Sequence, residues 1–256
     1  MSAPVRPAPL SDTAVMVHRS VRHSLRNVDA LFVSVLLPVL LMLLMTTVFG
    51  GAMDIDGSYV DYVVPGVIVL CAGYGASTTA MSVTKDMTEG IVTRFRTMNV
   101  LPSAVLTGHV AASVLRNLVS TGLVVLTALA IGFRPHAGLG GWLGALALLV
   151  LFITAMSWLS AAFGLVARSV EGASALGFVL LFLPYLSSAF VPVHTLPGWL
   201  QPIAEHQPFS PLIEAIRGLL LGTGVGDAGW IAVVWCAGLL MVSAAATAVL
   251  WRRSRG

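Results

Sequence analysis

The chain has 256 residues, of which 57% are hydrophobic and only 10% are charged. Soluble domains average about 25% charged residues, so this composition excludes an ordinary water-soluble domain and requires lipid to cover much of the surface. The formal net charge of +3 favours nucleic-acid binding only if the basic residues cluster on a soluble face.

The N-terminal 30 residues contain a basic segment with helical periodicity. Apolar residues such as Ala14, Val17, Val21 and Leu25 recur at helical spacing between Thr13 and Asn27, and arginines occupy other positions. A basic amphipathic helix next to a membrane span typically lies in the interface. We therefore expect residues 1–30 to form a cytoplasmic tail with an interfacial helix; the alternative is a solvated basic tail that only sets topology.

Six apolar runs follow, and together they define a predicted transmembrane domain over residues 31–251. Every backbone N–H and C=O must be paired within hydrocarbon, so each run is expected to be a helix. Pro38 and Pro184 should kink or loosen the first and fifth of them. The predicted spans are approximately 31–50, 62–83, 107–132, 141–166, 173–191 and 229–251, and a basic tail over 252–256 ends the chain.

The distribution of Arg and Lys predicts the orientation of these spans. Most basic residues lie in the N-terminal tail, the loops after the second and fourth runs, and the C-terminal tail. The opposite side carries only Arg134 and Arg217, so both termini are expected in the cytoplasm. Arg116 lies inside the third run, either as a cavity or dimer-interface charge or with its side chain snorkelling to the interface.

The loop from Thr84 to Gly108 is longer than a connection between two spans requires, which is about 2–8 residues. Met87, Ile91, Phe95 and Met98 fall on one face of a predicted helix within it. This pattern leaves two interpretations open: a surface that docks a partner, or a helix that rests on the headgroups.

A proline-rich external stretch over 192–227 contains an apolar piece, Leu212 to Leu221. Ser210 followed by Pro211 is a good helix start and Gly222 a good stop. The piece is too short to span the bilayer, so we expect it to be re-entrant. Glu214 and Arg217 are spaced i, i+3, which predicts an ion pair.

Several motifs are missing. The only lysine, Lys85, does not stand in G-x-x-x-x-G-K-[ST], so the chain is not expected to hydrolyse ATP or to hold a cofactor or a metal. No H-E-x-x-H is present and the six histidines are scattered, which argues against a membrane protease. No acidic residue lies clearly within a span, which argues against proton coupling.

Three stretches resemble the membrane subunit of type-2 ABC exporters, in the daunorubicin-resistance permease group. They are PVLLMLLMTTVFGG at residues 38–51, the region 59–110, and SSAFVPVHTLPGWLQPIAEHQPFSPLIEAIRGLLLG at residues 187–222. The proline spacing and final amphipathic helix of the third stretch are the most specific. Arg greatly outnumbers Lys, which is typical of a GC-rich bacterial genome and agrees with a bacterial plasma-membrane protein.

This resemblance implies a dimer of six-span permeases, as two copies of this chain or as a heterodimer, with two separate ABC subunits that bind ATP and Mg. The ATPase-coupling residues would be Lys85, Asp86, Glu89, Gly90, Arg94, Phe95 and Arg96. Spans two and five would line the substrate path, with Tyr74, Phe182 and Tyr185 as contacts. The expected function is outward movement of a hydrophobic or amphiphilic drug-like compound; the alternatives are a lipid or lipid-linked polysaccharide exporter, or a secondary carrier without an ATPase.

Overall fold

The computed structural model describes residues 28–51, 57–89 and 102–253, and the regular structure in these ranges is entirely helical. The predicted all-α class is therefore confirmed. The N-terminal interfacial helix and the central part of the predicted docking helix lie outside the described residues.

Within these described ranges, four helices are long and apolar enough to cross a bilayer: α3 (Tyr59–Thr88), α5 (Pro102–Ala130), α6 (Leu139–Val166) and α10 (Ala228–Arg253). They coincide with the second, third, fourth and sixth predicted runs. At about 1.5 Å rise per residue each measures about 39–45 Å, so each helix extends beyond a hydrocarbon core of about 30 Å.

The first and fifth predicted runs form shorter helices. α2 (Val28–Leu44) continues through Pro38 and passes into the π-helical turn η1 (Met45–Phe49). α7 (Val170–Phe182) ends before Pro184, where the 3-10 turn η2 (Leu183–Leu186) takes over. The fifth helix therefore ends earlier than the predicted residue 191, because proline has no N–H to donate and its ring clashes with the preceding turn.

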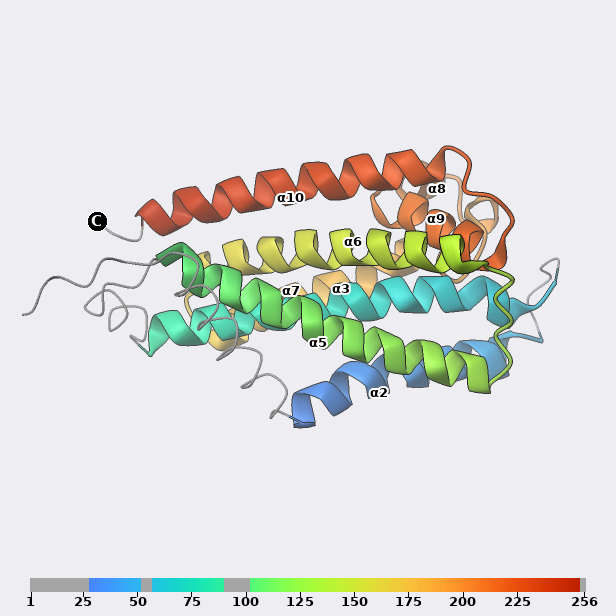
Figure 1. Ribbon diagram of the computed structural model, residues 1–256, viewed down its shortest axis with the longest axis horizontal. Coiled ribbons are helices and arrows are strands. Elements are labelled where there is room, and N and C mark those ends of the chain that lie inside the picture. Colours follow the sequence, from blue (N-terminus) through green and yellow to red (C-terminus); the bar gives the residue numbers. More distant parts are fainter. Residues whose placement is uncertain (1–27, 52–56, 90–101, 254–256) are drawn as a thin grey trace, which may run out of the picture.

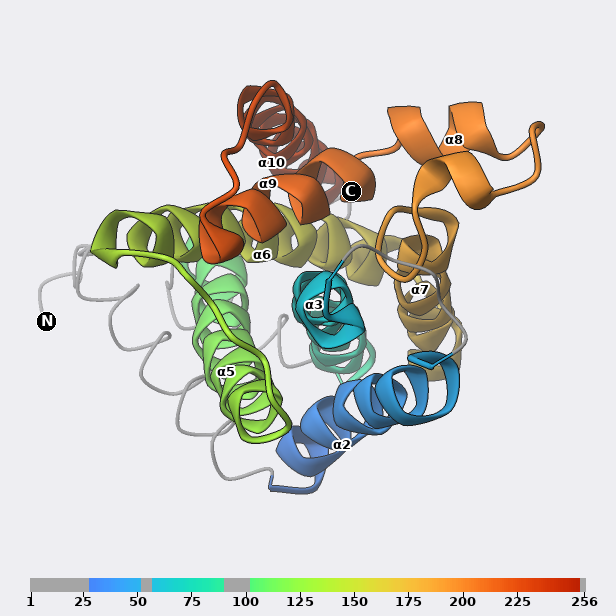
Figure 2. The same cartoon turned by 90° about the vertical axis from the view of Figure 1, so that its right-hand side faces the viewer.

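α3 is the central helix, and α2, α5, α6, α7 and α9 (Phe209–Leu221) pack around it (Figures 1 and 2). Within its most apolar stretch 89% of α3 is buried against the chain, compared with 17% for α10. A helix that is apolar all round is covered either by protein or by lipid, and α3 is covered by protein. The exposed surface of α10 is left to contact lipid or another chain.

Two glycines allow backbones to approach closely at opposite ends of α3. A Cβ atom on Gly66 would lie 2.7 Å from the carbonyl oxygen of Ala189, in the turn after η2. A Cβ atom on Gly164 of α6 would lie 2.6 Å from the carbonyl oxygen of Ala80. Small residues at helix crossings are the usual device for close packing within membranes.

Short helices gather at one end of the molecule, namely η3 (Val193–Thr195), α8 (Gln201–His206) and α9. Gly222 ends α9 with a left-handed φ of 72°, which confirms the predicted stop, and the helix begins at Phe209, close to the predicted start. The apolar face of α9 is fully buried on the bundle through Leu212, Ile213 and Ile216.

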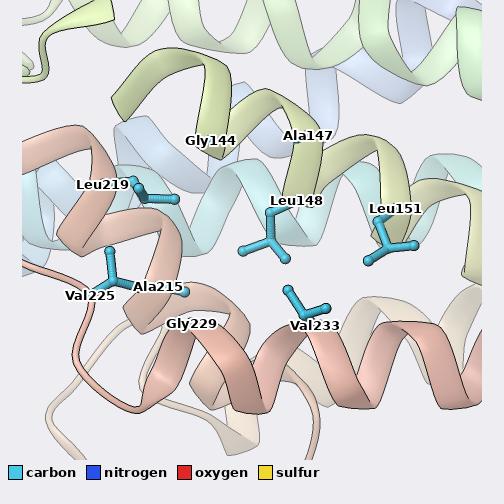
Figure 3. A pocket seen from close by; sticks show the side chains of 9 residues that line it. All are labelled: Gly144, Ala147, Leu148, Leu151, Ala215, Leu219, Val225, Gly229 and Val233. Atoms are coloured by element: carbon cyan, nitrogen blue, oxygen red, sulfur yellow. The ribbon is translucent and has the colours of Figure 1, made fainter. Parts of the chain in front are cut away.

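An open apolar groove of ≈ 270 Å³ lies between α6, α9 and α10 (Figure 3). Glycine and alanine make room for it, with Gly144 and Gly229 on facing helices and Leu219 of α9 at one end. Every lining side chain is apolar, so the groove offers contacts to hydrocarbon only. The predicted path residues Tyr74, Phe182 and Tyr185 do not line it.

Candidate functional site

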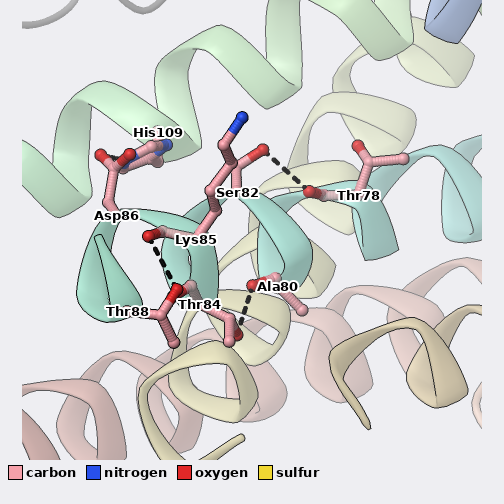
Figure 4. A network of polar contacts seen from close by, with 8 residues as sticks. All are labelled: Thr78, Ala80, Ser82, Thr84, Lys85, Asp86, Thr88 and His109. Carbon is pink, nitrogen blue, oxygen red and sulfur yellow. Dashed lines mark hydrogen bonds and ion pairs between the residues drawn. The ribbon is translucent and has the colours of Figure 1, made fainter. Parts of the chain in front are cut away.

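The end of α3 that leads into the predicted docking loop packs against three other helices. Val83, Leu106, Ala161 and Trp251, from α3, α5, α6 and α10, form a buried cluster separate from the main core. The Thr84 hydroxyl lies 2.9 Å from the carbonyl oxygens of Ala80 and of Gly164 and can donate to either. We call this region, with Thr84–Glu89 and the first turns of α5, the docking end (Figure 4).

Asp86, near the end of α3, and His109, near the start of α5, join the two helices on either side of the docking loop. Asp86 Oδ2 lies 3.0 Å from His109 Nε2, and both side chains are largely buried. The sequence identified Asp86 but missed His109, which had the appearance of one more scattered histidine. Its position at the far edge of the long loop, opposite Asp86, is the signal that could have indicated the pair.

Lys85 and Glu89 form an i, i+4 ion pair of 3.8 Å on the exposed face of the last turns of α3. Both side chains are at least half exposed, so a partner can reach them. The other predicted coupling residues, Gly90, Arg94, Phe95 and Arg96, lie outside the described residues. The docking role of this set stays a prediction.

The predicted path residues fall in two places. Tyr185 stacks on Phe190 at 4.7 Å between ring centroids, and Phe182 lies 6.1 Å from Tyr185. Tyr74 lies instead beside Gly177, where α3 and α7 cross. Among the described residues no ring contact joins Tyr74 to the other two. Phe182 is 60% exposed, whereas Phe190 is buried in the core, so this aromatic row runs from the surface of the subunit into its interior.

α5 carries a polar seam within the bundle. Ser113 bonds to Ser157 of α6 at 2.8 Å, Asn117 donates to Ser113, and Ser120 bonds to Ser34 of α2 at 2.9 Å. Asn117 also lies directly over Gly75 of α3, where a larger residue would not fit. Hydroxyl and amide side chains commonly join helices in this way inside membranes.

Arg116 belongs to the same helix and donates to the Thr78 hydroxyl of α3. Two interpretations of this charge were a cavity or dimer-interface role and snorkelling to the interface. The polar partner on α3 favours the first of them, because the side chain is held within the protein.

Arg217 has different partners from the one predicted. Its Nε and Nη2 donate to the carbonyl oxygen of Tyr62 at 3.1 and 3.0 Å, and Nη2 also donates to that of Ser188 at 2.8 Å. The guanidinium carbon lies 3.9 Å from the centre of the Tyr62 ring. In the described part of the chain no salt bridge within 4 Å joins Arg217 to Glu214, so the predicted ion pair is absent. Glu214 is exposed, and the buried carbonyls are the acceptors within reach.

Further hydrogen bonds to backbone atoms surround Arg217, and we call this region the α9 end. Tyr62 Oη donates to the carbonyl of Ser188 at 3.1 Å, and Tyr59 Oη donates to that of Phe190 at 3.1 Å. Asp61 accepts a bond of 2.9 Å from the backbone N–H of Arg134, in the loop between α5 and α6. Side chains of α3 and α9 thus tie down two loops.

The electrostatics of the α9 end depend on Arg217. Burial lowers the pKa of its guanidinium, and the neighbouring Tyr62 and Glu214 oppose that shift. Arginine nevertheless stays protonated in proteins. A full positive charge is therefore held by neutral carbonyls and an aromatic face, and the Glu214 carboxylate stays at the surface.

Comparison with known proteins places this arrangement in a family. The family model described as ABC-2 type transporter matches residues 11–221. The chain belongs to the ABC-2 type transporter family.

Two relatives illustrate the similarity. One is the daunorubicin resistance ABC transporter permease protein DrrB1 of Streptomyces coeruleorubidus, with 36% identity over 221 residues, 85% of this chain and 78% of the relative. Another is the probable doxorubicin resistance ABC transporter permease protein DrrC of Mycobacterium tuberculosis, with 27% identity over 250 residues, 96% of this chain and 90% of the relative.

The family assigns the class of function. The chain is a multi-pass membrane protein and the permease subunit of an ABC exporter, as the sequence predicted. ABC permeases work with ATP-binding subunits, so a partner of that kind is implied.

Proposed function

We propose that this permease moves a hydrophobic or amphiphilic compound of drug or antibiotic type out of a bacterial cell. The observation that carries the proposal is the 36% identity, over 85% of the chain, to a daunorubicin resistance permease. The apolar character of the helices and the exposed Phe182, with Tyr185 beside it, are compatible with such a substrate.

In this proposal α2 with η1 and α7 with η2 are the first and fifth spans, which gives six spans and places both termini in the cytoplasm. Their apolar parts, Ser34–Phe49 and Val170–Leu186, measure about 24–26 Å at 1.5 Å per residue, slightly less than an average hydrocarbon core. The docking end then faces the cytoplasm and the α9 end faces outside. Reporter fusions after Arg134 and after Arg168 test this topology; equal signals from both sites would contradict it.

The energy source is a pair of separate ABC subunits that bind ATP and Mg. Lys85, Asp86 and Glu89 mark where each subunit docks, since they are charged and lie where α3 leaves the bundle. A second permease, either another copy of this chain or a related one, completes the path. α3 is largely covered within one subunit, so the substrate path would run along the exposed side of α7. A second subunit is then needed to enclose the path on its other side.

The test combines co-purification with transport. Tagged permease should bring down an ATP-binding ABC subunit, and inverted vesicles that contain both should take up doxorubicin only with hydrolysable ATP. Uptake without ATP would indicate a secondary carrier. ATP-driven movement of a fluorescent lipid with no effect of doxorubicin would indicate a lipid exporter. If no ATPase is captured and ATP has no effect, the proposal fails.

A further inference from the structure

We propose that Arg217 is a latch: through the carbonyls of Tyr62 and Ser188 it holds α9, the start of α3 and the turn after η2 together, and so keeps the α9 end closed between transport cycles. The inference rests on the proposed function, in which the α9 end faces outside. Arg217 acts here as a positioning residue and is not assigned to substrate contact.

One guanidinium joins three segments that are far apart in sequence. Arg217 belongs to α9, Tyr62 to the first turn of α3, and Ser188 to the turn that follows η2. The bonds to the two carbonyls are between 2.8 and 3.1 Å, and the Tyr62 ring covers the charge at 3.9 Å. The planar fork of arginine suits this geometry, and a lysine ammonium would not reproduce it.

The carbonyl of Ser188 is where the contacts converge. It accepts from Arg217 Nη2 at 2.8 Å and from Tyr62 Oη at 3.1 Å, so a donor of α9 and a donor of α3 meet on one oxygen. Ser188 itself is buried, and its N–H donates to the Ser210 hydroxyl of α9 at 3.2 Å. A displacement of α3 or α9 would therefore strain several bonds at the same turn.

The nature of the acceptors suits a contact that opens and closes. Hydrogen bonds weaken steeply when distance or angle departs from the optimum. An ion pair would still attract over several more ångströms, but Glu214 is exposed and makes no salt bridge with Arg217 in the described part of the chain. The contact with neutral carbonyls is thus strong in the closed arrangement and lost after a small shift.

The outer turns of α3 are built to allow such a shift. Pro65 lacks the N–H that would bond to the carbonyl of Asp61, so the first turn of α3 is less firmly joined to the rest of the helix. Gly66, the next residue, crosses directly over Ala189 in the same turn as Ser188. The Tyr62 carbonyl that Arg217 binds, Pro65 and Gly66 therefore all lie in the first two turns of α3.

The experiment measures access to position 188 in the full permease with its ATP-binding subunit in membranes. Ser188→Cys is nearly isosteric and removes a buried hydroxyl without a hydrogen-bond partner among the described residues. The native thiols, Cys71 and Cys236, are both buried and give little background. The probe is a membrane-impermeant maleimide added from outside, with and without ATP.

With Arg217 intact we expect slow labelling without nucleotide and faster labelling during ATP turnover. Arg217→Gln should raise the nucleotide-free rate by about ten- to hundredfold, as expected for losing charge-assisted hydrogen bonds, and should abolish the response to ATP. Arg217→Lys should give an intermediate rate. Glu214→Gln, on the same helix, is the matched control and should retain the slow rate and the ATP response.

The readouts separate a latch from general loss of structure. A merely unfolded variant would also label Cys71, which lies buried in α3, whereas an opened latch would leave it unreactive. If Arg217→Gln does not accumulate, Arg217→Lys and Tyr62→Phe decide. The proposal is overturned if inserted Arg217 variants label no faster than the parent, whatever the transport result. Faster labelling in a protein that exports nothing would sustain the latch and reject the proposed function.

Discussion

The two ends of α3 are fastened in different ways. At the α9 end, donors from Arg217, Tyr62 and Tyr59 bind backbone carbonyls across three segments. At the docking end, a small apolar cluster and the pair of Asp86 and His109 hold the helices, and the Thr84 hydroxyl reaches the carbonyl of Gly164 on α6. The contacts at the α9 end therefore depend on the positions of backbone atoms. The contacts at the docking end depend mainly on the packing of side chains.

This difference shows what each end can tolerate. The carbonyls that Arg217 binds belong to α3 and to the turn after η2, so the bonds to them are lost together when one of these segments moves. A cluster such as Val83 with Trp251 adapts by small side-chain shifts. We expect the α9 end to switch between discrete arrangements and the docking end to move as a body.

The largest effect should come from filling the close crossings. Gly66→Leu at the α9 end and Gly164→Leu at the docking end place a side chain against backbone, and overpacking costs about 1–3 kcal/mol or more. Both should reduce the folded fraction sharply in size-exclusion chromatography of detergent extracts. Gly238→Leu on α10, where nothing lies within 4 Å, is the control and should behave like the parent. Normal yield from all three would contradict the crossings.

The next effect concerns the docking end alone. His109→Ala leaves a largely buried Asp86 without its partner, which costs about 1–3 kcal/mol. We expect lower thermal stability of the permease and weaker stimulation of the ATPase in reconstituted vesicles. His109→Gln keeps a donor and should recover part of both. His136→Ala, an exposed histidine of the α5–α6 loop, should change neither quantity. Unchanged stimulation in His109→Ala would separate this pair from coupling.

A smaller effect is expected from Tyr62→Phe, which removes one bond to Ser188 but keeps the aromatic face and the carbonyl that Arg217 binds. The expected loss is about 0.5–1.5 kcal/mol in thermal stability assays. Combined with Arg217→Lys, the losses should not add, because both donors share one oxygen. Strict additivity would show that the two bonds are independent.

The smallest effect should come from Lys85→Ala. Its ion pair with Glu89 is exposed, and such i, i+4 pairs contribute about 0.3–0.5 kcal/mol. Thermal stability should thus be unchanged within error. Any loss of ATPase stimulation in this variant would then come from the partner contact and not from the fold, and a stable, fully coupled variant would remove Lys85 from the docking surface.

Local signals in the sequence predicted the fold well. The start and stop of α9 could be predicted because Ser210, Pro211 and Gly222 influence the backbone conformation of the residues next to them. The long apolar runs predicted α3, α5, α6 and α10 for the same reason. The early end of α7 was missed because an apolar run continues past Pro184, although the proline itself breaks the helix.

Contacts between distant residues could not be predicted in the same way. The i, i+3 rule paired Arg217 with Glu214, but its acceptors belong to Tyr62 and Ser188, which are 155 and 29 residues away. Backbone carbonyls carry no sequence signature, so a side chain that binds them looks unpaired until the fold is known. His109 was missed for a related reason, because its partner lies 23 residues earlier, across a long loop.

The length of α3 has a mechanical consequence. Its 30 residues make one rod of about 45 Å, which is about 15 Å longer than the hydrocarbon it crosses. Tyr62, whose carbonyl Arg217 binds, lies near the start of this helix. The pair of Lys85 and Glu89 lies at its other end. A push at one tip therefore reaches the other as a tilt or a slide, with no flexible joint between them except the turn at Pro65.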